Sequence, residues 1–249
     1  MNVGGYRQMR LSIVIPAYNE EATIAQLIEL VKKVDLKQYG VEKEILVIDD
    51  GSKDETIEIV NNISGVKLIV REKNGGKGAA VKTGIEQATG DIIIIQDADL
   101  EYDPQDYYKC IKPIIDGRAK VVYGSRFLSE EQKRANKFFL KSKHEKAYNT
   151  AYLGGRFLTL LANTLYWSGI TDEATCYKTF DAKLIKSIKI NGNRFEWEPE
   201  ILAKVRKRGE HILEVPISYY PRTFEEGKKI NWKDGVQAIW TLVKYRFVD

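Results

Sequence analysis

The stretch that most constrains the fold is an unbroken apolar run, Ile92–Ile95, which leads into a cluster of acids. This short β-branched run, bounded by polar residues, indicates a central strand that is buried on both faces. Asp97, Asp99 and Glu101 follow at alternate positions. If the chain stays extended there, the three carboxylates point to one side, at the sheet edge where open α/β folds bind ligands. They would then suit Mg²⁺ or Mn²⁺ shared with a phosphorylated substrate, and a solvated acidic turn is the alternative interpretation.

Strand and helix patterns alternate on both sides of this run. We predict strands over 11–16, 44–48, 66–70, 92–95 and 119–123, and helices over 20–34, 53–63, 79–88 and 104–115. This order predicts an α/β fold with right-handed crossovers and a mainly parallel central sheet that has helices on both faces. Further along, the patterns predict helices over 155–167, 182–187, 199–208 and 232–247, and a strand pair over 211–220 that Pro216 interrupts.

Size and composition describe an ordinary globular chain. The 249 residues are 43% hydrophobic and 30% charged, so one domain with a substantial core is expected. The net charge of +4 neither establishes nor excludes an anionic partner. Cys110 and Cys176 form no disulfide framework and fit a reducing compartment. Residues 1–10 lack a secretory signal and no window is long enough to span a membrane, so we expect a cytoplasmic protein with at most peripheral membrane contact.

Several motifs, taken together, point to a known family. They are Pro16-Ala17-Tyr18-Asn19-Glu20-Glu21, Asp49-Asp50-Gly51-Ser52, Asp97-Ala98-Asp99, Gly124-Ser125-Arg126, and Arg222 followed by Glu226-Gly227-Lys228-Lys229. In this order they resemble glycosyltransferase family 2, which has the GT-A fold, and within it the dolichyl- or polyprenyl-phosphate mannosyl- and glucosyltransferases. The resemblance covers nearly the whole chain. It implies transfer of a hexose, with inversion, from a nucleotide sugar such as GDP-mannose or UDP-glucose to a lipid phosphate.

The resemblance also implies roles for the motif residues in a nucleotide-binding half, 11–126. The nucleobase and ribose would be held by Pro16, Ala17, Tyr18, Glu20, Val47 and Asp49. Asp50 has the alternative role of capping the next helix, for which Ser52 and Asp54 are also available. Asp97 and Ala98 would contact ribose and phosphate, and Asp99 would bind Mg²⁺ or Mn²⁺. Glu101 would be a second metal ligand, where many relatives have glutamine.

The remaining candidates concern phosphate and catalysis in an acceptor half, 127–249. Arg126 and Arg222 match family residues that meet the donor's phosphates, which an arginine fork binds at two points. Arg156, Lys228 and Lys229 are candidates for the acceptor phosphate, with a solvated surface as the alternative. A lipid phosphate is already an anion and needs no general base. Asp172 matches the place where relatives that transfer to alcohols carry a base, so it is a catalytic candidate that could act as a base, orient Lys178 or cap a turn.

The middle of the chain suggests where a lipid acceptor would bind. Basic residues over 133–146 precede an apolar helix over 157–167, and a polyprenyl phosphate needs both a cationic mouth and a hydrophobic trough near a membrane. Packing of that helix into the core is the alternative. A membrane surface is thus an expected partner, and a separate membrane-anchoring protein is a further candidate partner. No nucleic-acid motif is present, so no nucleic-acid partner is expected.

Three rival functions stay open. The first is a family 2 transferase that acts on a soluble sugar, glycan or protein. The second is a sugar nucleotidyltransferase, which would need a glycine-rich basic loop after the first strand, where this chain has 16–20. The third is a non-catalytic nucleotide-binding module. The cluster Gly75-Gly76-Lys77-Gly78 follows the third strand and is neither a P-loop nor a dinucleotide fingerprint.

Overall fold

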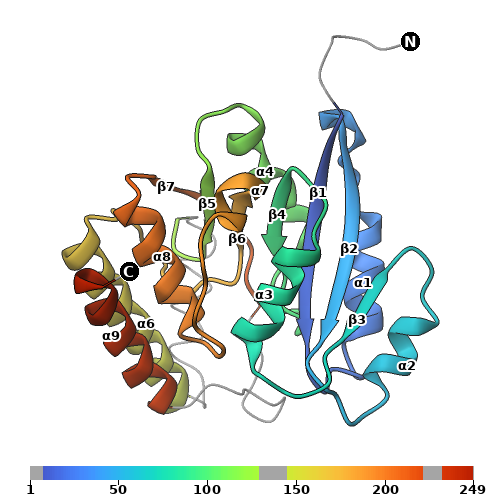
Figure 1. The fold of residues 1–249 in the computed structure, drawn as a ribbon, viewed down its shortest axis with the longest axis horizontal. Coiled ribbons are helices and arrows are strands. Elements are labelled where there is room, and N and C mark those ends of the chain that lie inside the picture. The colour runs from blue at the N-terminus through green and yellow to red at the C-terminus, as the bar shows by residue number, and fades with distance from the viewer. Residues whose placement is uncertain (1–7, 129–144, 221–231, 249) are drawn as a thin grey trace.

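The structure is a computed structural model that describes residues 8–128, 145–220 and 232–248, with the side chains of 145–151 left out (Figure 1). The strands are β1 Met9–Ala17, β2 Val41–Asp49, β3 Lys67–Val70, β4 Ile92–Ile95, β5 Val121–Ser125, β6 Lys178–Asp181 and β7 Ile212–Pro216. The helices are α1 Ile24–Lys33, α2 Thr56–Asn61, α3 Lys77–Gln87, α4 Tyr107–Ile115, α6 Glu145–Tyr166, α7 Ala182–Lys186, α8 Trp197–Lys207 and α9 Trp232–Phe247. Short 3₁₀ turns lie at Lys37–Tyr39 and Pro104–Asp106.

The described strands form one seven-stranded sheet in the order β3-β2-β1-β4-β6-β5-β7. All neighbouring pairs are parallel except those of β6, which runs antiparallel to β4 and to β5. The prediction of a mainly parallel α/β sheet is confirmed. Two strand predictions were wrong: β6 was not expected at all, and the strand pair over 211–220 is the single strand β7 followed by an isolated bridge between Tyr219 and Tyr102.

Strand direction decides which residues meet. Because β6 alone is reversed, the other strands all end at one edge of the sheet, and β6 begins there. Ala17, Asp49 and Ser125 close their strands at this edge, and Lys178 opens β6 beside them. The loop 171–177 therefore reaches the same edge as the motifs that follow β1, β2, β4 and β5.

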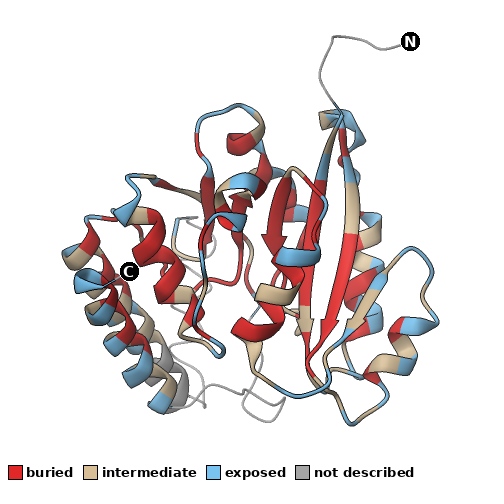
Figure 2. Ribbon diagram, in the orientation of Figure 1, coloured by how far each residue is buried: buried red, intermediate tan, exposed pale blue. Residues whose placement is uncertain are grey.

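Helices cover both faces of the sheet and bury its centre. The four isoleucines of β4 are completely buried, as the sequence predicts. In Figure 1, α3 lies in front of the sheet and α1 behind it. Gly84 of α3 approaches β1 so closely that a Cβ there would overlap the Val14 side chain. Buried residues are concentrated in the central strands and on the inward sides of the helices (Figure 2).

A second group of helices, α6, α8 and α9, packs together near the β7 end of the sheet (Figure 1). The predicted helix over 155–167 begins ten residues earlier than expected, at Glu145, and runs through Gly154 and Gly155. The helix continues there although glycine weakens helix interiors. None of the helices in the described ranges combines the length and hydropathy needed to cross a bilayer.

Candidate active site

The turn after β1 is tied to the loop after β2. The backbone N–H of Asp50 donates to the carbonyl of Ala17 at 2.8 Å, and the N–H of Asn19 donates to Ser52 Oγ at 2.9 Å. Asn19 has a φ of 53°, a left-handed conformation that asparagine tolerates better than most residues. The four residues predicted for this turn thus lie beside the Asp49 loop: Pro16, Ala17, Tyr18 and Glu20.

The two carboxylate oxygens of Asp49, at the end of β2, differ in their hydrogen bonding. Its Oδ2 accepts the N–H groups of Gly51 and Ser52, both at 2.9 Å. Its Oδ1 is buried and has no hydrogen-bond partner among the described residues. A buried acceptor without a partner is costly and is therefore a candidate contact for a ligand N–H. Val47, two residues earlier on the same strand, is completely buried on the same face of the sheet.

The interpretation of Asp50 as a helix cap was wrong. Its carboxylate accepts the N–H groups of Gly75 and Gly76 and pairs with Arg71. Asp50 thereby fixes the glycine-rich loop that leads into α3, a contact across the fold that the local sequence does not reveal. Asp54 instead serves the start of α2, where it accepts the N–H of Thr56 at 3.1 Å.

The three acids after β4 do not form the predicted row of carboxylates. The chain turns over residues 98–100, and Leu100 has a φ of 63°, so the alternation of an extended strand stops. The Asp97 carboxylate pairs with the ammonium of Lys77 at 2.9 Å. The Glu101 carboxylate accepts the Tyr219 hydroxyl at 3.0 Å. Ala98 is buried between these positions. The expectation of an extended chain here was wrong.

Asp99 and Glu101 are linked within this turn through the backbone of Glu101. Asp99 Oδ1 accepts the N–H of Glu101 at 3.2 Å. Across the described ranges, no three His, Cys, Asp or Glu side chains are grouped to hold a metal ion. Magnesium and manganese nevertheless need only one or two carboxylates when water and substrate phosphates supply the other oxygens. This donor set therefore fits a cation shared with a phosphorylated ligand, and Asp97, paired with Lys77, lies outside it.

Lys77, the first residue of α3, was missed as a site residue. Its ammonium contacts Asp97 at 2.9 Å and Glu198 of α8 at 3.0 Å. Glu198 also lies 3.5 Å from the ammonium of Lys178, which is completely buried. Burial disfavours the charge on Lys77, but the two carboxylates outweigh it and raise its pKa well above the ordinary value. The only sequence signal was a lysine between glycines after a strand, which matched no phosphate-binding motif.

Arg126 and Asp172 form a two-point ion pair. The Arg126 side chain donates from Nε and Nη2 to the two Asp172 oxygens, each at 2.7 Å, and its backbone N–H donates to Oδ2 at 3.0 Å. The guanidinium lies 5.0 Å from the centre of the Tyr219 ring. Burial disfavours its charge, but Asp172 outweighs burial and raises the pKa of Arg126. Both Asp172 oxygens are therefore engaged, which favours an orienting role over that of a base.

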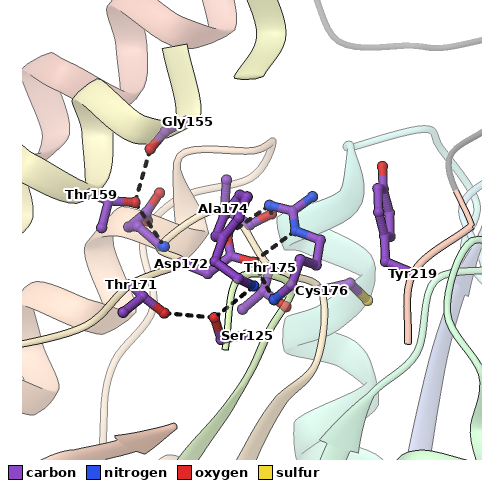
Figure 3. Close-up of polar contacts among 12 residues, drawn as sticks. Ser125, Gly155, Thr159, Thr171, Asp172, Ala174, Thr175, Cys176 and Tyr219 are labelled. Carbon is purple, nitrogen blue, oxygen red and sulfur yellow. Dashed lines mark hydrogen bonds and ion pairs between the residues drawn. The ribbon is translucent and has the colours of Figure 1, made fainter. Parts of the chain in front are cut away.

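The loop that carries Asp172 is held from several strands. Glu214 of β7 accepts the N–H groups of Thr171 and Asp172, at 2.6 and 3.0 Å. Ser125 and Thr171 share a hydroxyl contact of 2.6 Å (Figure 3). The Lys178 ammonium donates to the carbonyls of Glu173 and Thr175. Lys178 thus fixes the backbone next to Asp172. Of the roles left open for Asp172, the alternative that it orients Lys178 was wrong, because Arg126 is its partner.

Glu173 is a buried carboxyl next to this pair. Burial raises its pKa to about 7, although Lys178 acts in the opposite direction. Its Oε1 has no hydrogen-bond partner in the part of the chain that the structure describes. Its backbone N–H donates to Thr159 of α6, whose hydroxyl donates to the carbonyl of Gly155 (Figure 3). Helix α6 is therefore tied directly to the Asp172 loop.

The acceptor-phosphate candidates divide into two groups. Arg156 of α6 donates from Nη1 to the carbonyl of Thr171 at 3.0 Å and stands 5.1 Å from the centre of the Phe127 ring. It therefore lies at the margin of the Arg126 site, although its side chain is exposed. Arg222, Lys228 and Lys229 lie outside the described residues, as does most of the basic segment 133–146.

Comparisons with known proteins identify the family of this chain. The sequence profile of the family described as Glycosyl transferase family 2 matches residues 12–188, more than half of the chain. The low-salt glycan biosynthesis hexosyltransferase Agl6 of Haloferax volcanii is 28% identical over 241 residues, which cover 96% of this chain and 53% of that protein. The dolichol-phosphate mannosyltransferase of Pyrococcus furiosus is 28% identical over 223 residues, covering 88% and 59%. The chain thus spans somewhat over half the length of these relatives.

A solved structure shares the fold. Glucosyl-3-phosphoglycerate synthase from Mycobacterium tuberculosis, in complex with Mn²⁺, uridine diphosphate and phosphoglyceric acid, superposes with a TM-score of 0.69. The match covers 97% of this chain and 80% of that one at 21% identity. The predicted GT-A fold is confirmed, and so is the resemblance to family 2 and its dolichyl-phosphate transferases.

Proposed function

We propose, from the premise that this chain belongs to glycosyl transferase family 2, that it is an inverting, metal-dependent hexosyltransferase with a polyprenyl or dolichyl phosphate as acceptor. One observation carries the proposal. The buried free acceptor of Asp49, the acidic turn that holds Asp99 and Glu101, and the Arg126 guanidinium all lie at the same edge of the sheet. Together these groups offer a nucleobase contact, a cation site and a phosphate contact.

The donor would lie along this edge. Asp49 Oδ1 is suited to accept the imide-type N–H that both uracil and guanine present, so UDP-glucose and GDP-mannose are both candidate donors. The β1 turn would hold the ribose, together with Ala98 and Asp97. Asp99 and Glu101 would hold Mg²⁺ or Mn²⁺, which stabilises the charge of a departing diphosphate. Arg222, in the same family motif set, remains a candidate for the diphosphate.

The chemistry needs no proton transfer from the acceptor. An oxygen of the lipid phosphate forms a bond to the anomeric carbon as the bond from that carbon to the donor's diphosphate breaks. A single displacement inverts the configuration and releases the nucleoside diphosphate. Arg126 would contribute by binding phosphate oxygens in a fixed orientation, and Asp172 would position Arg126. Arg156, Lys228 and Lys229 remain candidates for the acceptor phosphate.

The two halves of the chain would act as one domain. Residues 11–126 would bind the nucleotide and 127–249 the acceptor, and the participation of β6 and β7 in the same sheet supports this arrangement. An acceptor dissolved in a bilayer would place the protein at a membrane surface, on its cytoplasmic face. A separate membrane-anchoring partner is compatible with this arrangement.

A transfer assay tests the proposal. The protein is incubated with Mn²⁺, a short polyprenyl phosphate in detergent, and either GDP-mannose or UDP-glucose labelled in the sugar. We expect one donor to give a lipid-soluble, acid-labile hexosyl phosphate, and chelation by EDTA to stop its formation. Label transferred only to phosphoglycerate or to free sugars would instead establish a soluble acceptor, the class of acceptor named for the mycobacterial synthase.

A further inference from the structure

We propose that α6 and α9 together form a face that docks on an anionic lipid surface. The first observation is on α6. Leu153, Phe157 and Leu160 are 64%, 52% and 64% exposed. Their spacing places them on one side of the helix, opposite Ala162 and Tyr166, which are buried. The apolar helix that the sequence predicts therefore has its core contacts on one side and leaves a second apolar stripe in contact with solvent.

Helix α9 repeats this arrangement with larger side chains. Trp232, Val236, Trp240 and Phe247 are 74%, 56%, 59% and 81% exposed and recur on one side of the helix. The opposite side is buried through Ala238, Thr241, Leu242 and Tyr245. Figure 2 shows exposed residues on the outer side of successive α9 turns. Scattered exposed apolar residues are normal on a protein, but large ones aligned along two helices mark an interaction surface.

The two stripes belong to one face. The Tyr166 hydroxyl near the end of α6 donates to the Leu242 carbonyl near the end of α9 at 2.6 Å. The Arg246 guanidinium stands 5.8 Å from the ring centre of Trp167, which follows α6 and is itself exposed. The helices are therefore side by side with their carboxyl ends together, and both pack on α8 (Figure 1). Lys204 of α8 stands 4.7 Å from the centre of the Tyr245 ring, on the side of α9 opposite its stripe. Arg206 of α8 donates to the carbonyl of Tyr166, the residue that ends α6 opposite its stripe, so both stripes point away from α8.

The positive charges on α6 and α9 indicate which partner fits this face. Arg156 is the only charged residue between 152 and 166, and α9 carries Lys233, Lys244 and Arg246 against the single acid Asp234. Tryptophan with flanking lysine and arginine is the composition that binds the boundary between anionic headgroups and acyl chains. A second copy of the chain, related by two-fold symmetry, would instead bring two cationic rims together. The chemistry therefore fits a membrane with anionic lipid better than it fits a dimer.

The consequence for the active site rests on the proposed function. The Asp172 loop is held by Thr159, on the side of α6 that faces away from the stripe, and by Arg156, which borders the stripe. The thickness of one helix, about 10 Å, therefore separates the lipid surface from the loop that orients Arg126. Docking through α6 and α9 would place the phosphate of a membrane-embedded acceptor beside this loop without extracting the lipid chain.

Vesicle flotation tests the docking face directly. The full chain is mixed with phosphatidylcholine vesicles that do or do not contain phosphatidylglycerol, with neither donor nor acceptor present. We expect flotation with the anionic vesicles and about tenfold or greater loss of binding in a Phe157→Ser/Trp167→Ser/Trp240→Ser variant. Tyr108→Ser, on α4, removes an aromatic that is 42% exposed elsewhere in the fold and should float like the wild type. A Lys244→Glu/Arg246→Glu variant should lose the preference for anionic vesicles.

Three results would contradict the proposed docking face. Equal flotation of the wild type and the triple-serine variant, or no flotation of the wild type, would overturn the docking face. So would a wild-type dimer in sedimentation equilibrium that the serine substitutions convert to monomer, because the stripe would then join two copies. Circular dichroism checks that the variants fold. Transfer to detergent-dispersed polyprenyl phosphate should survive Trp240→Ser alone, because α9 lies outside the predicted acceptor helix over 157–167. For the wild type, transfer without flotation rejects docking alone, and flotation without transfer rejects the proposed function alone.

Discussion

The guanidinium of Arg126 and the carboxylate of Asp172 meet through two parallel contacts of 2.7 Å, one to each carboxylate oxygen. Arg126 lies just after β5, and Asp172 lies in the loop before β6, so the pair joins two strands that run in opposite directions. Asp172 is almost completely buried and Arg126 mostly so. The pair thus holds one cation in a fixed direction at the sheet edge where we place the phosphates.

Asp172→Asn should cost both stability and activity. The substitution keeps the shape of the side chain but leaves the Arg126 charge without its main partner, a change that costs about 3 kcal/mol of unfolding free energy when a pair is buried. A misdirected guanidinium should also lower hexose transfer by about a hundredfold. Urea unfolding and initial rates measure the two effects. Asp116→Asn, which breaks the exposed pair with Lys112, is the control and should change stability by less than about 0.5 kcal/mol. Equal behaviour of the two variants would contradict the assigned role.

Asp99→Asn should remove metal-dependent turnover and spare the fold. A neutral amide is a poor ligand for Mn²⁺, so we expect transfer at saturating donor to fall by about a hundredfold or more. The melting temperature should be unchanged within about 2 °C. Asp103→Asn is the matched control in the same segment, because Asp103 only caps the turn at Pro104–Asp106. If Asp99→Asn keeps the wild-type rate and the wild-type Mn²⁺ dependence, the metal lies elsewhere.

Glu173 should make the protein less stable as the pH rises. Its pKa in the folded chain is about 7 and its ordinary value is 4.5, so between these values the folded state binds more protons than the unfolded state. Its contribution to the unfolding free energy is complete below about pH 4.5, falls as the pH rises toward 7 and stays low above it. The unfolding free energy lost over this range is roughly 3 kcal/mol. Glu173→Gln should therefore raise the unfolding free energy at pH 8 more than at pH 5. A gain that is the same at both pH values would show that burial does not perturb this carboxyl.

Asp49→Asn should weaken nucleotide binding. An amide cannot accept from Gly51, Ser52 and a nucleobase as a carboxylate can, and loss of a hydrogen bond to a charged group costs about 1.5–3 kcal/mol. Isothermal titration with uridine and guanosine diphosphates should thus show about a 10- to 100-fold rise in Kd for the preferred nucleotide. Glu44→Gln, five residues before Asp49 on β2, provides the comparison and should bind as the wild type does. Unchanged affinity in Asp49→Asn would place the base elsewhere.

The sheet was largely predictable because its signals are local. The isoleucine run of β4 and the alternation of strands with helices fix a parallel order with little help from distant contacts. Strand β6 was not predictable in this way, because Lys178 and Asp181 stand at the ends of only four residues. Lys178 tolerates burial there because contacts from other segments, among them Glu198 and two backbone carbonyls, satisfy its charge.

In the site, too, the positions of some residues follow from local sequence signals, whereas their partners do not. Motif residues at strand ends, such as Asp49 and Arg126, lie where parallel strands must bring them. Their partners depend on contacts between remote segments: Asp50 holds the glycine loop before α3, and Asp172 meets Arg126 only because β6 inserts between β4 and β5. The turn at Leu100 likewise breaks a pattern of acids that looked regular in the sequence.

The most direct test of the central claim is a crystal structure of the protein with Mn²⁺ and its preferred nucleoside diphosphate. Our account predicts density for the base at Asp49 Oδ1, and for the cation at Asp99 between the protein and the diphosphate. Nucleotide density away from the carboxyl edge of the sheet, with Asp49 and Asp99 uncontacted, would contradict it.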